Sequence, residues 1–142
     1  TGKWLAVGLF LLAVIPFRSF AGGWHAKEFW QCAILSNLMI VIMLICTEEL
    51  CITKEIVYVI FEVITLLALI FIIPTQNPNK KLSQNELKKY KKVSFIIWLV
   101  QCCLLVVFFV YKSYQFSTIM LYTHIVIVIA AVAQTMSETK NR

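Results

Sequence analysis

Five apolar runs, separated by short polar connections, divide the chain and limit the folds open to it. We expect helices over residues 4–17, 29–46, 56–73, 93–111 and 116–133. The first run is short of the roughly 20 residues that a helix needs to cross a bilayer, so we expect a short span or a half-inserted helix there, bent or ended by Pro16. Helices satisfy their own backbone hydrogen bonds in lipid. The pattern predicts an all-α fold, a polytopic transmembrane helix bundle that forms one membrane domain over residues 1–142.

The composition agrees with a membrane protein. Of the 142 residues, 61% are hydrophobic and 14% are charged, whereas soluble domains contain about 45–50% apolar and about 25% charged residues. The basic residues outside one loop are too few to suggest a nucleic-acid surface, and no nucleic-acid-binding motif occurs. We therefore expect membrane lipids as partners and no nucleic acid. The chain begins with Thr1 and passes almost at once into an apolar run, so we also expect a missing N-terminal segment.

The basic residues are distributed unevenly between the two sides of the predicted bundle. If all five runs cross, ten of the 13 Lys and Arg residues lie on one side, in residues 18–27, residues 75–92 and the C-terminal tail. Lys3, Lys54 and Lys112 lie on the other side. Because positively charged loops stay in the cytoplasm, we expect a multi-pass protein of the cell membrane with residues 18–27 and 75–92 on the cytoplasmic side.

Residues 17–32 contain the side chains best suited to catalysis. His25 can act as a base and Cys32 as a nucleophile, because a nearby imidazole raises the ionised fraction of a thiol. In one continuous helix their Cα atoms would be about 10 Å apart along the axis, too far for the hydrogen bond of about 3 Å that links a nucleophile to its base. We therefore expect the helix that carries Cys32 to begin after His25. The adjacent Gly22 and Gly23 give the loop the backbone freedom to fold back.

The order of these residues resembles the signature of a known family. Arg18, the Gly22-Gly23 pair, His25-Ala26 and Cys32 follow one another as in the AgrB family of membrane-embedded cysteine peptidases, which process precursors of autoinducing peptides in bacterial quorum sensing. The spacing from His25 to Cys32 is similar to that of the family, and a polar loop with Pro and Lys followed by two further spans extends the resemblance over nearly the whole chain.

The resemblance implies a reaction and a substrate. It implies that Cys32, activated by His25, attacks a peptide carbonyl of the precursor, releases the C-terminal tail and leaves a thioester. An internal Cys or Ser of the peptide then closes a thiolactone or lactone ring. It further implies substrate-binding or orienting roles for Arg18, Gly22, Gly23, Lys80 and Lys81. No cofactor and no metal are expected, and a homodimer stays open because the sequence does not determine the oligomeric state.

The lysine-rich segment 75–92 has three interpretations. It carries six lysines against one glutamate, namely Lys80, Lys81, Lys88, Lys89, Lys91 and Lys92 against Glu86. The segment can simply set the topology, it can hold anionic lipid headgroups, or it can attract the acidic C-terminal region that the family's substrates carry. Arg18 likewise either anchors its helix at the interface or binds a carboxylate through two parallel hydrogen bonds.

Polar residues inside the apolar runs offer an alternative function. An ionisable residue within a membrane span is by default a functional candidate, so Glu62 supports the alternative of a small proton-coupled transporter or channel subunit. A third hypothesis is a non-catalytic membrane partner. His124 lies at a similar depth and can pair with Glu62 across the bundle, and we favour a structural role for Glu62. For Asn37 we favour an interhelical hydrogen bond.

The five cysteines form no C-x-x-C metal or redox spacing. We expect Cys102 and Cys103 to pack against lipid or neighbouring helices, because they lie in an apolar run. Cys46 and Cys51 flank a short loop, and we expect free thiols there rather than a disulfide. Cys32 is therefore the one cysteine to which the sequence assigns chemistry.

Overall fold

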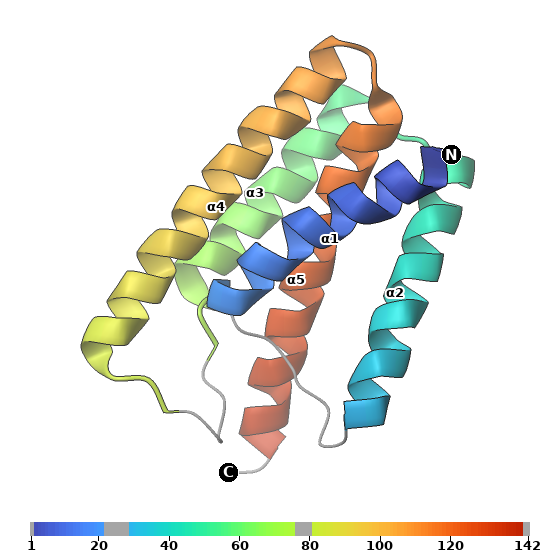
Figure 1. Cartoon of the computed structure of the whole chain (residues 1–142). Coiled ribbons are helices and arrows are strands. Elements are labelled where there is room, and N and C mark those ends of the chain that lie inside the picture. The colour runs from blue at the N-terminus through green and yellow to red at the C-terminus, as the bar shows by residue number, and fades with distance from the viewer. Residues whose placement is uncertain (1, 22–28, 76–80, 141–142) are drawn as a thin grey trace.

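The computed structural model describes residues 2–21, 29–75 and 81–140, and this part of the chain is all-helical (Figure 1). It contains five helices: α1 (Gly2–Ala21), α2 (Phe29–Glu49), α3 (Glu55–Phe71), α4 (Gln84–Val110) and α5 (Tyr114–Lys140). The predicted all-α fold is confirmed.

Helix α5 is the centre of the bundle. It packs against each of the other four helices, and successive helices run in opposite directions (Figure 1). Helices α3 and α4 lie on one side of α5 and α2 on the other, while α1 crosses α5 obliquely. The central position of α5 explains its burial, which includes polar residues such as Thr123 and His124.

Contacts between helix ends show which ends share a side of the bundle. Near the N-terminus, Lys3 Nζ forms an ion pair with Glu48 Oε1 at 3.0 Å, which joins the start of α1 to the end of α2. At the opposite side, the backbone N–H of Thr75 donates to Ala21 O at 3.0 Å. The end of α1 and the end of α3 therefore lie together, on the side where α2 and α4 begin (Figure 1).

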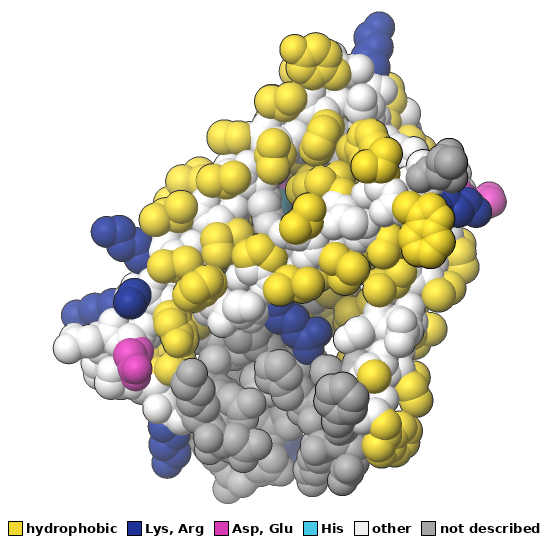
Figure 2. Space-filling model, in the orientation of Figure 1, with side chains coloured by type: hydrophobic (Ala, Val, Ile, Leu, Met, Phe, Trp, Pro, Cys, Tyr) yellow, Lys and Arg dark blue, Asp and Glu magenta, His cyan; other side chains and the backbone are white. Residues whose placement is uncertain are grey.

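The outer surface of the bundle is apolar. Among the described residues, α1, α4 and α5 are long and apolar enough to cross a membrane. Large hydrophobic side chains point outward, for example Leu12 at 75% and Val110 at 70% exposure, and Figure 2 shows such side chains spread over α1 and α4. A soluble protein rarely exposes so much contiguous apolar surface, so the chain is a multi-pass membrane protein.

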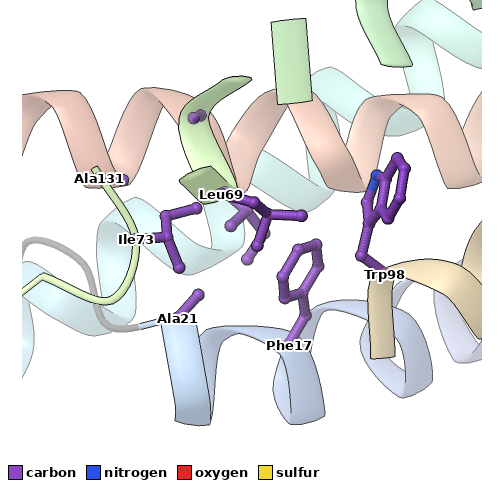
Figure 3. Packing of buried hydrophobic residues seen from close by; sticks show 8 residues of the cluster. Phe17, Ala21, Leu69, Ile73, Trp98 and Ala131 are labelled. Carbon is purple, nitrogen blue, oxygen red and sulfur yellow. The ribbon is translucent and has the colours of Figure 1, made fainter. Parts of the chain in front are cut away.

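A hydrophobic cluster holds four helices together near the side where α1 ends. Phe17 and Ala21 of α1 face Leu69 and Ile73 at the end of α3, with Trp98 of α4 beside them (Figure 3). Ile127 and Ala131 of α5 complete the cluster, and both are fully buried. The last turn of α1, which leads into the predicted catalytic segment, is therefore packed on three other helices.

Helix α1 is longer than the first apolar run. It covers 20 residues and continues through Pro16 to Ala21, so of the two expected effects of Pro16, a bend or the end of the helix, the second is wrong. Membrane helices tolerate proline because neighbouring groups satisfy the freed carbonyls. The helix thereby carries Arg18 in its last turn, where a cation interacts favourably with the helix dipole.

The lysine-rich segment is only partly a loop. Our sequence interpretation of residues 75–92 as a polar loop is wrong for Gln84–Lys92, which form the first turns of α4. Ser83 caps this helix: Glu86 N–H donates to Ser83 Oγ at 3.3 Å, and Ser83 N–H donates to Glu86 Oε2 at 2.8 Å. This reciprocal capping box satisfies two backbone donors at the helix start. Four lysines are therefore held on a helix rather than on a mobile loop.

We predict that Ser83→Ala frays the start of α4. Loss of a serine N-cap costs about 1 kcal/mol, so the backbone amides of residues 84–88 should exchange with deuterium roughly fivefold faster, measured by hydrogen-exchange mass spectrometry on the purified protein. Ser83→Asp keeps a good capping side chain and is the matched control. Equal exchange in Ser83→Ala and the unmodified protein would show that the lysine helix does not depend on this cap.

Candidate functional site

The predicted catalytic segment lies between the end of α1 and the first turn of α2. Gly22, Gly23, His25 and Lys80 lie outside the described residues, so their predicted roles stay predictions. Cys32 is in the first turn of α2, and its side chain is also outside the described part. Arg18 and Lys81 are described.

Arg18 and Lys81 have different surroundings. Arg18 is half-buried in the last turn of α1, whereas Lys81 is exposed ahead of the start of α4. Both residues nevertheless lie on the same side of the bundle. They are at ends of helices that the hydrophobic cluster and the Thr75–Ala21 hydrogen bond hold together.

A cavity of about 510 Å³ lies between α1 and α2, beside the predicted catalytic segment. Its walls are mainly apolar, and its polar side chains are Arg18, Ser19 and Ser36. Ser36 follows Cys32 by four residues, which is one helical turn, so the cavity borders the part of α2 that carries the predicted nucleophile. The lining is Phe10, Leu11, Val14, Ile15, Arg18, Ser19, Ser36, Met39, Ile40 and Val126.

The sequence did not reveal this cavity. Its walls come from α1, α2 and α5, and its existence depends on the oblique crossing of α1, which no local pattern of residues encodes. Asn37, which we expected to bond between helices, instead donates from Nδ2 to Ala33 O at 3.0 Å within its own helix and is exposed. That expectation is wrong, because the residue faces outward.

A second polar site lies in the middle of the bundle and centres on Glu62. The distance between His124 Nδ1 and Glu62 Oε1 is 2.7 Å, so the predicted pairing of Glu62 on α3 with His124 on α5 is present. His124 is fully buried, whereas the Glu62 side chain is 17% exposed. Phe17 of α1 meets the imidazole edge-on at 5.8 Å between ring centroids.

Helix α4 contributes three further partners to this site, which sequence reasoning missed. Trp98 Nε1–H donates to Glu62 Oε2 at 3.0 Å, and the Cys102 thiol donates to the same oxygen at 3.3 Å. Gln101 Oε1 lies 3.0 Å from His124 Nε2, and Gln101 Nε2 donates to Ala13 O of α1 at 2.7 Å. Cys102 is thus a hydrogen-bond donor as well as packing material, and Cys103 is exposed.

The hydrogen bonds fix how many protons this polar cluster holds. Because Gln101 Nε2 donates to Ala13, its Oε1 accepts from His124 Nε2–H. One further proton then lies between His124 Nδ1 and Glu62 Oε1. Whichever of the two atoms carries it, the pair has no net charge, as an apolar surrounding favours. The cluster is therefore complete as a neutral hydrogen-bond network, which supports the structural interpretation of Glu62.

Three side chains of this cluster, Glu62, Cys102 and His124, are of types that bind metal ions. One ligand atom each of Glu62, Cys102 and His124 lies within 4.8 Å of the others. Tetrahedral zinc with bonds of about 2.0–2.1 Å would hold a nitrogen and an oxygen ligand roughly 3.3 Å apart, whereas His124 Nδ1 and Glu62 Oε1 are 2.7 Å apart. The spacing fits a shared proton rather than a shared metal ion.

Glu62→Gln and Glu62→Leu should separate a structural from a proton-carrying role. Gln can accept from Trp98 and donate to His124 Nδ1, so we expect stability close to that of the unmodified protein. Leu leaves three groups without a partner, namely the Trp98 indole N–H, the Cys102 thiol and His124 Nδ1, at about 1–3 kcal/mol each. We expect its thermal unfolding midpoint, measured in detergent, to fall by several degrees. A Gln variant as unstable as the Leu variant would show that the carboxylate charge itself is required.

The four cysteines whose side chains are described, Cys46, Cys51, Cys102 and Cys103, are free thiols. The expectation of free thiols at Cys46, in the last turn of α2, and at Cys51, just after that helix, is therefore confirmed.

Comparison with known proteins places the chain in a family. No curated protein and no solved structure matches the chain. One family does: the family described as "AgrB: Accessory gene regulator B" matches residues 1–137. The match covers α1 to α4 in full, α5 as far as residue 137, and the segment from Arg18 to Cys32. Together with the multi-pass helical fold, it shows that this chain belongs to the AgrB family.

Proposed function

We propose that this protein is a membrane-embedded cysteine endopeptidase that removes the C-terminal tail of an autoinducing-peptide precursor and promotes cyclisation of the remaining peptide. Membership of the AgrB family implies processing of a precursor of this kind. The observation that carries the finer proposal is the position of Cys32 in the first turn of α2, seven residues after His25, beside an apolar cavity that contains Arg18.

The proposed reaction has two acyl transfers. The Cys32 thiolate attacks the scissile carbonyl, His25 gives the leaving amine a proton, and the C-terminal tail departs with its new amino group. The remaining peptide is held as a thioester on Cys32. A Cys or Ser side chain within that peptide then loses its proton to His25 and attacks the thioester, which restores the Cys32 thiol and closes the ring. No oxidant, nucleotide or metal is needed for this balance.

Exclusion of water decides whether the ring forms. Water competes with the internal nucleophile for the thioester, so the second transfer requires a site from which water is largely removed. The cavity beside α2 has mainly apolar walls, which supports this role. We assign Arg18 to orient a substrate carboxylate at its edge, since a guanidinium binds a carboxylate with two parallel hydrogen bonds. Backbone N–H groups near Gly23 or at the start of α2 are the candidates for stabilising the oxyanion.

The distribution of positive charge indicates which side of the bundle faces the cytoplasm. The side of the bundle where α1 ends and α4 begins carries Arg18, Lys81 and the four lysines of the first turns of α4. We therefore place this side, and with it the catalytic residues, in the cytoplasm. The cytosol keeps Cys32 reduced.

Cys32→Ala and His25→Ala should each abolish cleavage of a co-expressed precursor, detected by mass analysis of the peptide products. Nucleophile and base act as one unit, so the double variant should be no worse than either single one. Cys103→Ala is the matched control, because its thiol is exposed and distant in sequence, and it should retain activity. Full cleavage by Cys32→Ala would remove the proposed nucleophile.

Lys80→Gln/Lys81→Gln tests recruitment of an acidic substrate tail. Long-range attraction adds to binding without acting on the transition state. The double variant should therefore raise KM several-fold with little change in kcat, and the difference should shrink at high salt. The measurement is cleavage rate against precursor concentration at two salt concentrations, with the topology checked by cysteine labelling. An unchanged KM with correct topology would limit these lysines to setting the orientation of the chain.

A further inference from the structure

A cleft of about 330 Å³ lies between the end of α3 and the start of α4, apart from the segment that carries Cys32. Three lysines and three hydrophobic residues line it: Lys88, Lys91 and Lys92 with Leu69, Ile70 and Phe95. Figure 2 shows Lys and Arg side chains gathered over the start of α4, next to the apolar surface of the bundle. A basic group above an apolar wall complements an anionic lipid, which has a negatively charged headgroup above apolar acyl chains.

The lysines and the aromatic ring belong to one face of α4. Lys88, Lys92 and Phe95 follow one another at intervals of four and three residues, which places them along a single helical stripe. The stripe passes from charged to apolar where α4 enters its hydrophobic run at Val93. The capping box of Ser83 and Glu86 holds these first turns helical, so the stripe is built into a rigid element.

Lys91 already has a structural partner. Its Nζ donates to Ile70 O at 2.6 Å, in the last turn of α3. This bond satisfies a carbonyl at a helix end and brings α3 to the same level as the charged turns of α4. Among the described residues, no acidic side chain forms an ion pair with Lys88 or Lys92. Their ammonium groups are therefore available to an external anion.

We propose that this cleft binds one anionic phospholipid, with its phosphate between Lys88 and Lys92 and an acyl chain against Ile70 and Phe95. Basic pockets between membrane helices on the cytoplasmic side bind anionic headgroups. The apolar half of the lining favours a lipid over an acidic peptide, because a polar tail would gain nothing from covering Ile70 at 47% and Phe95 at 41% exposure. The lipid would tie α3 to α4 at the membrane boundary.

The test is lipid binding to the purified full chain, measured by native mass spectrometry. Phosphatidylglycerol and phosphatidylcholine with identical acyl chains are titrated separately. We expect one phosphatidylglycerol to bind more tightly than phosphatidylcholine. Lys88→Gln/Lys92→Gln should weaken phosphatidylglycerol binding roughly thirtyfold, the factor that corresponds to about 1 kcal/mol for each of two lysines, with little effect on phosphatidylcholine.

The matched control removes the same charge from the same side of the bundle. Lys89 and Lys140 do not line this cleft, so Lys89→Gln/Lys140→Gln should leave the affinity for phosphatidylglycerol within about threefold. An equal loss in both pairs would overturn the proposal in favour of diffuse surface charge. Equal affinity for the two lipids would also overturn it. A Glu-rich decapeptide that requires Lys88 and Lys92, while phosphatidylglycerol does not, would reassign the cleft to peptide binding.

Discussion

The chain of hydrogen bonds from Ala13 through Gln101 and His124 to Glu62 is the interaction on which the arrangement of the bundle depends. It connects α1, α4, α5 and α3 in turn. Apolar contacts between membrane helices are nearly matched by contacts with lipid, so they specify position weakly. A polar group in hydrocarbon instead requires a partner. Each member of this chain has one, and the rotation of each helix about its own axis is restricted as a result.

The network also holds α1, the helix that leads into the predicted catalytic segment. Gln101 accepts from His124 and donates to the carbonyl of Ala13, in the middle of α1. One turn further along α1, Phe17 packs against the imidazole, and one turn beyond that Ala21 enters the hydrophobic cluster (Figure 3). The end of α1 is therefore held at two levels. A helix that crosses its neighbours obliquely can thus present Arg18 at a fixed place beside α2.

The sequence predicted the helices well and their ends poorly, for a physical reason. Apolar runs mark where a helix must be buried in lipid, and five such runs correspond to five helices. Helix ends lie in water, where hydrophobicity carries no information. Gln84–Lys92 read as a loop by composition, yet Ser83 and Glu86 are the S-x-x-E signal of a helix start. Likewise α5 continues to Lys140 through a polar tail.

The candidate sites were predictable to different degrees. Glu62 and His124 are conspicuous because they interrupt apolar runs, and their depth predicted the pairing. Gln101 and Trp98 also lie in an apolar run, but nothing in a sequence states which way a helix faces. Their roles follow only from the rotation of α4 toward Glu62. The chemistry of the His25 and Cys32 pair was read from residue types, spacing and resemblance.

The lysines on the charged side of the bundle lie in two different settings, which suit two different roles: recruitment of the substrate and binding of a lipid. Lys81 precedes α4 and is exposed, so a substrate tail can approach it from water. Lys88 and Lys92 lie at the level where the helix becomes apolar, and Lys91 is bonded to α3. A lipid in that cleft would occupy Lys88 and Lys92 and leave Lys81 to attract the precursor. Substrate recruitment and membrane anchoring would then use separate charges on the same side of the bundle.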